Sequence, residues 1–262
     1  MCTVKSMPLR RLVGPPLARL APLWSRKIAV LALALAAPTI ALGAPQVRGK
    51  LVGLEKLMNP VWAEAKESSS HRFSWREPSP TVRAEFRSLY AYAPKEVCVA
   101  ALASTPQSPP ALPLLITVGG GRTTPVTVVV APGTRLHFEN RDPFPHRLYA
   151  VGQTSFPPGD MVAMAARDWT APAPGKYELR DELSPSVRSW VVVEPHAAAV
   201  AYPSTQGVFS FSQLAPGEYV IKAYFTGVPV GAPKSVAVGA ATVTDVLLPV
   251  AEGTKAEAGE RE

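Results

Sequence analysis

The sequence predicts an all-β protein built from short, mostly antiparallel strands. Three observations carry this prediction: apolar and polar residues alternate over many short stretches, turn chemistry separates the stretches, and proline recurs too often for long helices. The 262 residues include 29 Pro and 18 Gly. Many short strands with frequent turns are typical of a β-sandwich or barrel. The turns stand at Gly119-Gly120-Gly121, Pro132-Gly133, Pro158-Gly159, Pro174-Gly175 and Pro216-Gly217.

Basic charge is concentrated at the N-terminus. The chain has 27 Lys and Arg against 20 Asp and Glu, a formal net charge of +7. Residues 1–44 hold six of the bases and no acid, so 21 bases face 20 acids in the remainder. That remainder is nearly neutral and does not predict nucleic-acid binding.

The same N-terminal segment has the pattern of a signal peptide. Arg26-Lys27 precedes the apolar run 28–37, and a cleavage-site pattern of small residues ends at Ala44. We therefore expect 1–44 to be a signal peptide, no stable membrane span after its cleavage, and a periplasmic or secreted protein. An uncleaved anchor is the alternative.

The strands are expected in order along the rest of the chain, and one stretch, 160–168, has a helical pattern of one or two turns. Residues 45–113 hold the first strands and a Pro-rich connector, 114–194 form a tightly punctuated β unit, and 195–250 form a smaller β module. The charged tail 251–262 lacks apolar anchors and is expected to be disordered. The expected strands are 47–54, 82–92, 96–101, 114–118, 126–130, 135–140, 147–151, 175–180, 190–194, 208–213, 218–225, 235–238 and 242–250.

Residues 126–193 resemble a cupredoxin, the plastocyanin-like copper fold. A strand, the Pro132-Gly133 turn and a strand ending in Asn140 match that family, and His146 stands where the family has its first copper ligand. Copper-binding relatives then read Tyr-x-x-x-Cys-x-x-His-Pro-x-Met. Here the spacing is kept from Tyr177, but the ligands are not: Asp181, Ser184 and Val187 replace Cys, His and Met.

The resemblance therefore implies the Greek-key fold without the electron transfer. A blue-copper site needs two imidazoles and a thiolate, and His146 is left at a vestigial ligand position. We expect no cofactor and no metal ligands, with copper held by a rearranged site around His146 as the alternative. Cys98 lies outside the motif in an apolar, strand-like stretch, which indicates a buried and inert thiol.

Residues 195–230 resemble a carboxypeptidase regulatory-like, or transthyretin-like, module. Alternating apolar residues flank the Pro216-Gly217 turn, as in that family: Phe209 and Phe211 before it, Tyr219 and Ile221 after it. The strands at 45–58 and 82–102 resemble the opening strands of such a module. The cupredoxin-like unit is therefore expected to be inserted between its two halves.

Two further features bear on function. Asp181 and Glu182 form an adjacent acid pair, but neighbouring strand residues point to opposite faces, which disfavours joint acid–base work. Five aromatic residues are expected around the former metal end, mostly in the core, with a ligand-binding rim as the alternative. These aromatics are Phe144, Tyr149, Phe156, Trp169 and Trp190.

The function that these patterns predict is a non-catalytic binding or interaction unit of the cell envelope. The copper protein with a rearranged site is the first alternative, and a hydrolase with a carboxylate groove is the second. The expected partner is an envelope protein or a glycan, and no catalytic residue is assigned.

Overall fold

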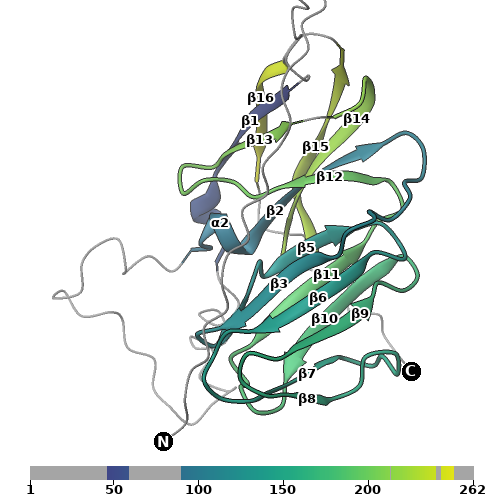
Figure 1. Cartoon of the computed structure of the whole chain (residues 1–262). Coiled ribbons are helices and arrows are strands. Elements are labelled where there is room, and N and C mark those ends of the chain that lie inside the picture. The colour runs from purple at the N-terminus through teal and green to yellow at the C-terminus, as the bar shows by residue number, and fades with distance from the viewer. Residues whose placement is uncertain (1–45, 59–89, 213, 240–242, 251–262) are drawn as a thin grey trace, which may run out of the picture. The chain divides into compact units, whose positions relative to one another are not determined.

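The computed structural model describes residues 46–58, 90–212, 214–239 and 243–250. The predicted signal peptide, most of the predicted strand 82–92 and the tail 251–262 lie outside the described residues. Within them the chain is almost entirely β, with one short helix, α2 (Ala93–Glu96), and a 3-10 turn, η1 (Leu54–Lys56) (Figure 1). No helix in the described ranges is long and apolar enough to span a membrane.

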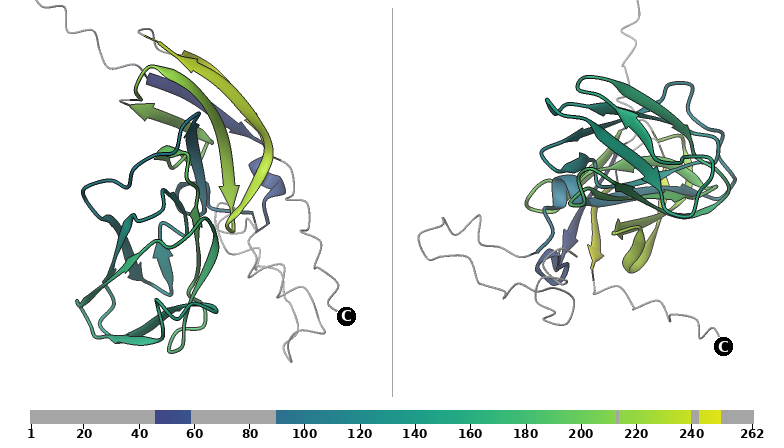
Figure 2. Two further views of the ribbon diagram at one scale, coloured as in Figure 1. Left: turned by 90° about the vertical axis from the view of Figure 1, so that its right-hand side faces the viewer. Right: turned by 90° about the horizontal axis from the view of Figure 1, so that it is seen from below.

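The first sandwich consists of two sheets whose strands come from both ends of the described chain. One sheet has the order β13-β1-β16 and the other β12-β2-β14-β15, so strands from before residue 104 pair with strands from after residue 195. Figure 2 shows β14 and β15 as a long curved hairpin. The strands are β1 (Gln46–Val52), β2 (Val97–Ala103), β12 (Ala197–Ala201), β13 (Val208–Ser212), β14 (Gly217–Phe225), β15 (Val228–Val238) and β16 (Val243–Pro249).

Alternation along these strands builds the core of the first sandwich. Phe209 and Phe211 are buried while their neighbours are exposed, and Tyr219 and Ile221 are buried on the facing sheet. Gly49 leaves room for the Phe209 ring on the neighbouring strand β13, because a Cβ there would lie 2.4 Å from that ring. The predicted apolar face of the C-terminal module is therefore a core face, and β1 and β2 supply the rest of that core.

The second sandwich lies wholly between β2 and β12 in the sequence. Its sheets have the orders β4-β3-β6-β9 and β5-β11-β10-β7-β8. Phe138, Leu148, Phe156, Trp169 and Leu179 fill the space between them. The strands are β3 (Leu114–Gly119), β4 (Arg122–Thr124), β5 (Thr127–Val130), β6 (Arg135–Asn140), β7 (His146–Ala150), β8 (Gly159–Met161), β9 (Ala166–Thr170), β10 (Gly175–Asp181) and β11 (Arg188–Val193).

A small third cluster contains residues of β2, β5 and β14. Cys98, Ala100, Leu102, Val129 and Tyr224 are its buried members. Cys98 is fully buried, and burial raises the pKa of its thiol to about 12. The thiol therefore stays protonated at neutral pH, in line with the inert cysteine expected from the sequence.

The prediction of an all-β chain built from sandwiches is confirmed, but the helical stretch at 160–168 is wrong. Strand β8 pairs with β7, and β9 pairs with β6. Apolar residues spaced for a helix over so few positions also suit two short strands, and sheet pairing decides the outcome here. Trp169 is buried while Asp168 and Thr170 are exposed, which is strand alternation.

Candidate functional site

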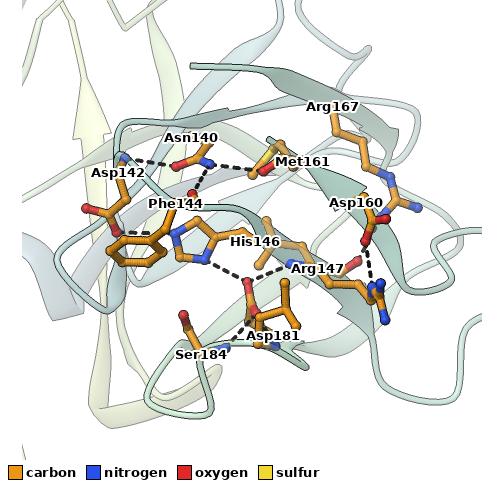
Figure 3. A network of polar contacts seen from close by, with 12 residues as sticks. Asn140, Asp142, Phe144, His146, Arg147, Asp160, Met161, Arg167, Asp181 and Ser184 are labelled. Carbon is orange, nitrogen blue, oxygen red and sulfur yellow. Dashed lines mark hydrogen bonds and ion pairs between the residues drawn. The ribbon is translucent and has the colours of Figure 1, made fainter. Parts of the chain in front are cut away.

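The site is the end of the second sandwich where the resemblance places the copper ligands. His146 begins β7, Asp181 ends β10, and Asp142 lies in the β6–β7 connection between Asn140 and His146. All three belong to segments that leave or enter the sheets at this end (Figure 3).

His146 is fully buried, with a carboxylate on each side of its ring. Its Nδ1 lies 2.9 Å from Asp181 Oδ2, and its Nε2 lies 3.2 Å from Asp142 Oδ2. The two contacts place the imidazole between two carboxylates and join His146, Asp142 and Asp181 in one buried polar cluster.

Asp181 organises the loop that follows it. Its Oδ1 accepts hydrogen bonds from the backbone N–H groups of Leu183 (2.7 Å) and Ser184 (2.8 Å), and its Oδ2 accepts one from the Arg147 N–H at 3.1 Å. With the His146 contact, this buried carboxylate has four partners. The residue at the family's cysteine position thus has a structural role in this chain.

Asp142 connects the cluster to the glycine-rich turn. Both of its carboxylate oxygens lie 3.0 Å from the Gly120 N–H. This bond lowers the pKa of Asp142 below its ordinary value, and the contact with His146 lowers it further. Gly120 and Gly121 adopt positive φ angles of 61° and 74°, which let the turn present N–H groups to an anion. That anion is the chain's own carboxylate.

Asn140 ties the neighbouring loops together. Its Nδ2 donates to the carbonyls of Phe144 (2.8 Å), Met161 (3.0 Å) and Val162 (3.0 Å), and its Oδ1 accepts from the Asp142 N–H at 2.8 Å. A single buried amide therefore holds the β6–β7 loop against the end of β8. Figure 3 shows that Asn140, Asp142 and His146 lie next to one another, and polar contacts join them in one network.

Val187 and Phe144 complete the packing around His146. Val187, at the axial ligand position, is fully buried in the apolar core. The Phe144 ring centroid lies 5.2 Å from that of His146, while about half of Phe144 remains exposed. Ser184, at the second histidine position, closes a turn in which its carbonyl accepts from the Val187 N–H at 2.9 Å.

The residues present do not fit a blue-copper centre. That centre needs two imidazoles and a thiolate converging on one point, whereas Asp142 and Asp181 contact opposite edges of one imidazole. Among the residues that the structure describes, no group of three or more His, Cys, Asp or Glu side chains is arranged to hold a metal ion. Cys98 belongs to the third cluster, on β2.

The remaining predicted residues are placed as follows. Phe156 and Trp169 stack in the core at 5.2 Å between ring centroids, as expected for most of the aromatic set. Trp190 is buried away from the His146 network: its Cβ would lie 2.9 Å from a Cβ added at Gly227. Glu182 is exposed, and its carboxylate lies 3.4 Å from the Arg147 guanidinium. The two adjacent acids therefore have different surroundings: Asp181 contacts the buried His146, and Glu182 contacts a surface arginine.

Asp142 was not identified from the sequence. Two features of the sequence point to Asp142 as a site residue: it is a carboxylate four residues before His146, and the chain has a glycine-rich turn able to bind an anion. Neither is specific by itself, because the two segments are about twenty residues apart and only strand pairing between β3 and β6 brings them together.

No protein-family model matches the sequence, and no curated protein matches it. Solved structures similar to the chain include amicyanin from Paracoccus versutus (Thiobacillus versutus), at 19% identity over 38% of this chain and 99% of that chain, with a TM-score of 0.30. Another is a Cu-containing nitrite reductase from Thermus scotoductus SA-01, at 18% identity over 35% of this chain and 25% of that chain, with a TM-score of 0.29. The chemistry of the site therefore has to be argued from its own residues.

Proposed function

We propose that the chain is a non-catalytic binding protein of the cell envelope, built on a copper-free cupredoxin-like fold. Export rests on the basic and apolar pattern of residues 1–44, which is that of a signal peptide. The proposed location is the periplasm or the extracellular space, and the proposed partner is an envelope protein or a glycan.

One observation carries the copper-free assignment. Both ring nitrogens of His146 contact carboxylates within the chain, and the Asp181 carboxylate already has three backbone N–H donors. A metal at His146 would have to displace a satisfied buried hydrogen-bond network without gaining a thiolate. The hydrogen bonds, rather than a metal, connect the loops at this end.

The surface of the same end supports a binding role. Phe144, Val162, Met164 and Leu183 are between 45% and 66% exposed. Phe144 and Val162 lie on loops held by Asn140, and Leu183 lies on the loop held by Asp181. Apolar side chains fixed on ordered loops are suited to a partner surface.

The acid pair supports the non-catalytic part of the proposal. A hydrolase with two carboxylates needs both to face one reacting bond. Asp181 is buried against His146, whereas Glu182 is at the surface beside Arg147. The two carboxylates therefore do not share a groove.

The test compares the wild-type chain with a triple variant, Asp181→Cys, Ser184→His and Val187→Met, during titration with copper(II). The spacing of the ligand loop is kept, so the variant is expected to gain an intense visible thiolate-to-copper band that the wild type lacks. Asp181→Cys alone is the control for a thiol without the second imidazole. Tight binding of one copper per wild-type chain would overturn the proposal, and circular dichroism checks that each variant is folded.

A further inference from the structure

A cleft of about 330 Å³ lies between β12 and the end of β5, and none of Asn140, Asp142, His146 and Asp181 lines it. Residues 197–200 form one wall and residues 129–131 the other, with Gln107, Ser108 and Pro110 of the connector beside them. None of the described residues that line the cleft is charged. The cleft is therefore suited to an uncharged occupant.

The lining pattern shows which part of β12 faces the cleft. Successive side chains of a strand point to opposite faces, so a cavity over one face touches every second residue. This cleft touches four residues in succession, 197–200, across a register irregularity between Ala197 and Ala199. No residue of β2 lines it, so the cleft adjoins the edge of β12 that faces away from β2, where the backbone N–H and C=O groups of an edge strand point.

That edge of β12 is open to another strand. β12 is the terminal strand of its sheet and pairs, among the described strands, with β2 alone. β5 likewise is the terminal strand of its five-stranded sheet. The cleft thus lies between two sheet edges, with Val129, Val130 and Leu114 providing apolar surface.

β12 carries neither of the two residue types, charged residues and proline, that most often protect an edge strand from pairing. Edges are normally guarded by charged residues, proline or bulges that turn the edge away. The opposite edge of the same sheet, β15, carries Pro229, Pro233 and Lys234. β12 reads Ala-Ala-Ala-Val-Ala, with one register irregularity at its start and no charge or proline.

We propose that β12 and this cleft bind an extended, uncharged peptide segment of a partner protein, which adds to the sheet as a further strand. Backbone hydrogen bonds to β12 provide the affinity, and the small apolar cleft selects small apolar side chains. A charged segment is excluded because no lining residue offsets its desolvation. This inference rests on the proposed function, since it names the class of partner that a binding protein of this kind takes.

The test uses a fluorescein-labelled peptide with a central Ala-Val-Ala-Val-Ala segment, flanked by Ser and Gly, and fluorescence polarisation with the full chain. Ala198 is exposed, so Ala198→Lys adds a charge at the cleft without burying it. The matched control is Ala232→Lys, at an exposed position on β15, the other edge of the same sheet. A second peptide, N-methylated at alternate residues, keeps the side chains but cannot donate along one edge.

The labelled peptide is expected to bind saturably to the wild-type chain. Ala198→Lys and N-methylation of the peptide are each expected to weaken its affinity about tenfold or more, since a tenfold change corresponds to roughly one hydrogen bond. Ala232→Lys is expected to leave the affinity unchanged. Absence of binding, or equal binding of the N-methylated peptide, would contradict strand addition. Sedimentation completes the test: a dimer that Ala198→Lys dissociates would make a second copy the occupant and overturn the proposal. None of these results alters copper binding, so failure here is distinct from failure of the copper-free assignment.

Discussion

At the scale of single residues, the site is defined by a buried imidazole between two carboxylates. His146 is 0% exposed, and its two contacts connect a β6–β7 loop residue, Asp142, with the end of β10 at Asp181. Such a cluster is stable only while all of its members are present, because a lone buried charge is costly. Its value to the protein is the positioning of three loops.

His146→Leu is expected to lower the free energy of unfolding by about 3–5 kcal/mol, because it leaves two carboxylates without their shared partner. His146→Gln retains one amide donor group and is expected to lie between Leu and the wild type. Urea unfolding measures the series.

The matched control is His137→Leu. His137 and Asp168 form a 2.5 Å pair on the surface, with side chains 37% and 51% exposed, so the expected loss is about 1 kcal/mol or less. Equal losses at His146 and His137 would show that the buried network contributes nothing beyond an ordinary surface pair.

The loss of stability at low pH depends in part on Asp142. The pKa of Asp142 in the folded chain lies below its ordinary value of 3.8 because of the Gly120 N–H. Its carboxylate therefore stabilises the fold above that pH, and the stabilisation is lost as the pH falls through the lower folded pKa. Asp142→Asn is expected to flatten the fall of the urea midpoint below about pH 4. An unchanged slope would refute this assignment.

The sequence predicted part of this site and missed part. The spacing from Tyr177 singled out Asp181, Ser184 and Val187, because that spacing is local to β10 and its loop, and the stretch after Asn140 singled out His146. Asp142 was missed because its partner, the Gly120 N–H, comes from a separate hairpin. Only the parallel pairing of β3 with β6 places the two side by side.

At the scale of elements, long alternating strands were predictable and short edge strands were not. β6, β10 and β14 match their expected ranges closely, since each buries every second residue over part of its length. β4, β8, β9 and β12 were not predicted. They are three to five residues long and depend on a neighbouring strand for their conformation.

Close approach at the β14–β15 turn can be measured with two glycines. Gly227 (φ +73°) has no room for a Cβ, which would lie 2.9 Å from Trp190 Cβ, whereas Gly152 (φ +70°) has nothing within 4 Å. Both Ala variants share the cost of a left-handed backbone, about 1–2 kcal/mol. Gly227→Ala is expected to be less stable than Gly152→Ala by about 1–3 kcal/mol in urea unfolding, from overpacking. Identical midpoints would exclude a tight contact at Trp190.

At the scale of the whole molecule, one sandwich is continuous in sequence and the other is not. Strands before residue 104 and after residue 195 share one core, with the second sandwich's strands between them. The expected insertion followed from the resemblance of both flanking segments to one module. Which strands pair could not be predicted, because β1 has partners more than 150 residues away on both of its edges.

The central claim for the molecule is that hydrogen bonds hold together the loops that correspond to the metal-binding end of a cupredoxin. The most direct measurement is the metal content of the wild-type chain purified from a copper-supplemented culture, together with its visible spectrum. We predict copper far below one atom per chain and no thiolate-to-copper absorption. One copper per chain, lost together with loop order in His146→Gln, would contradict the account.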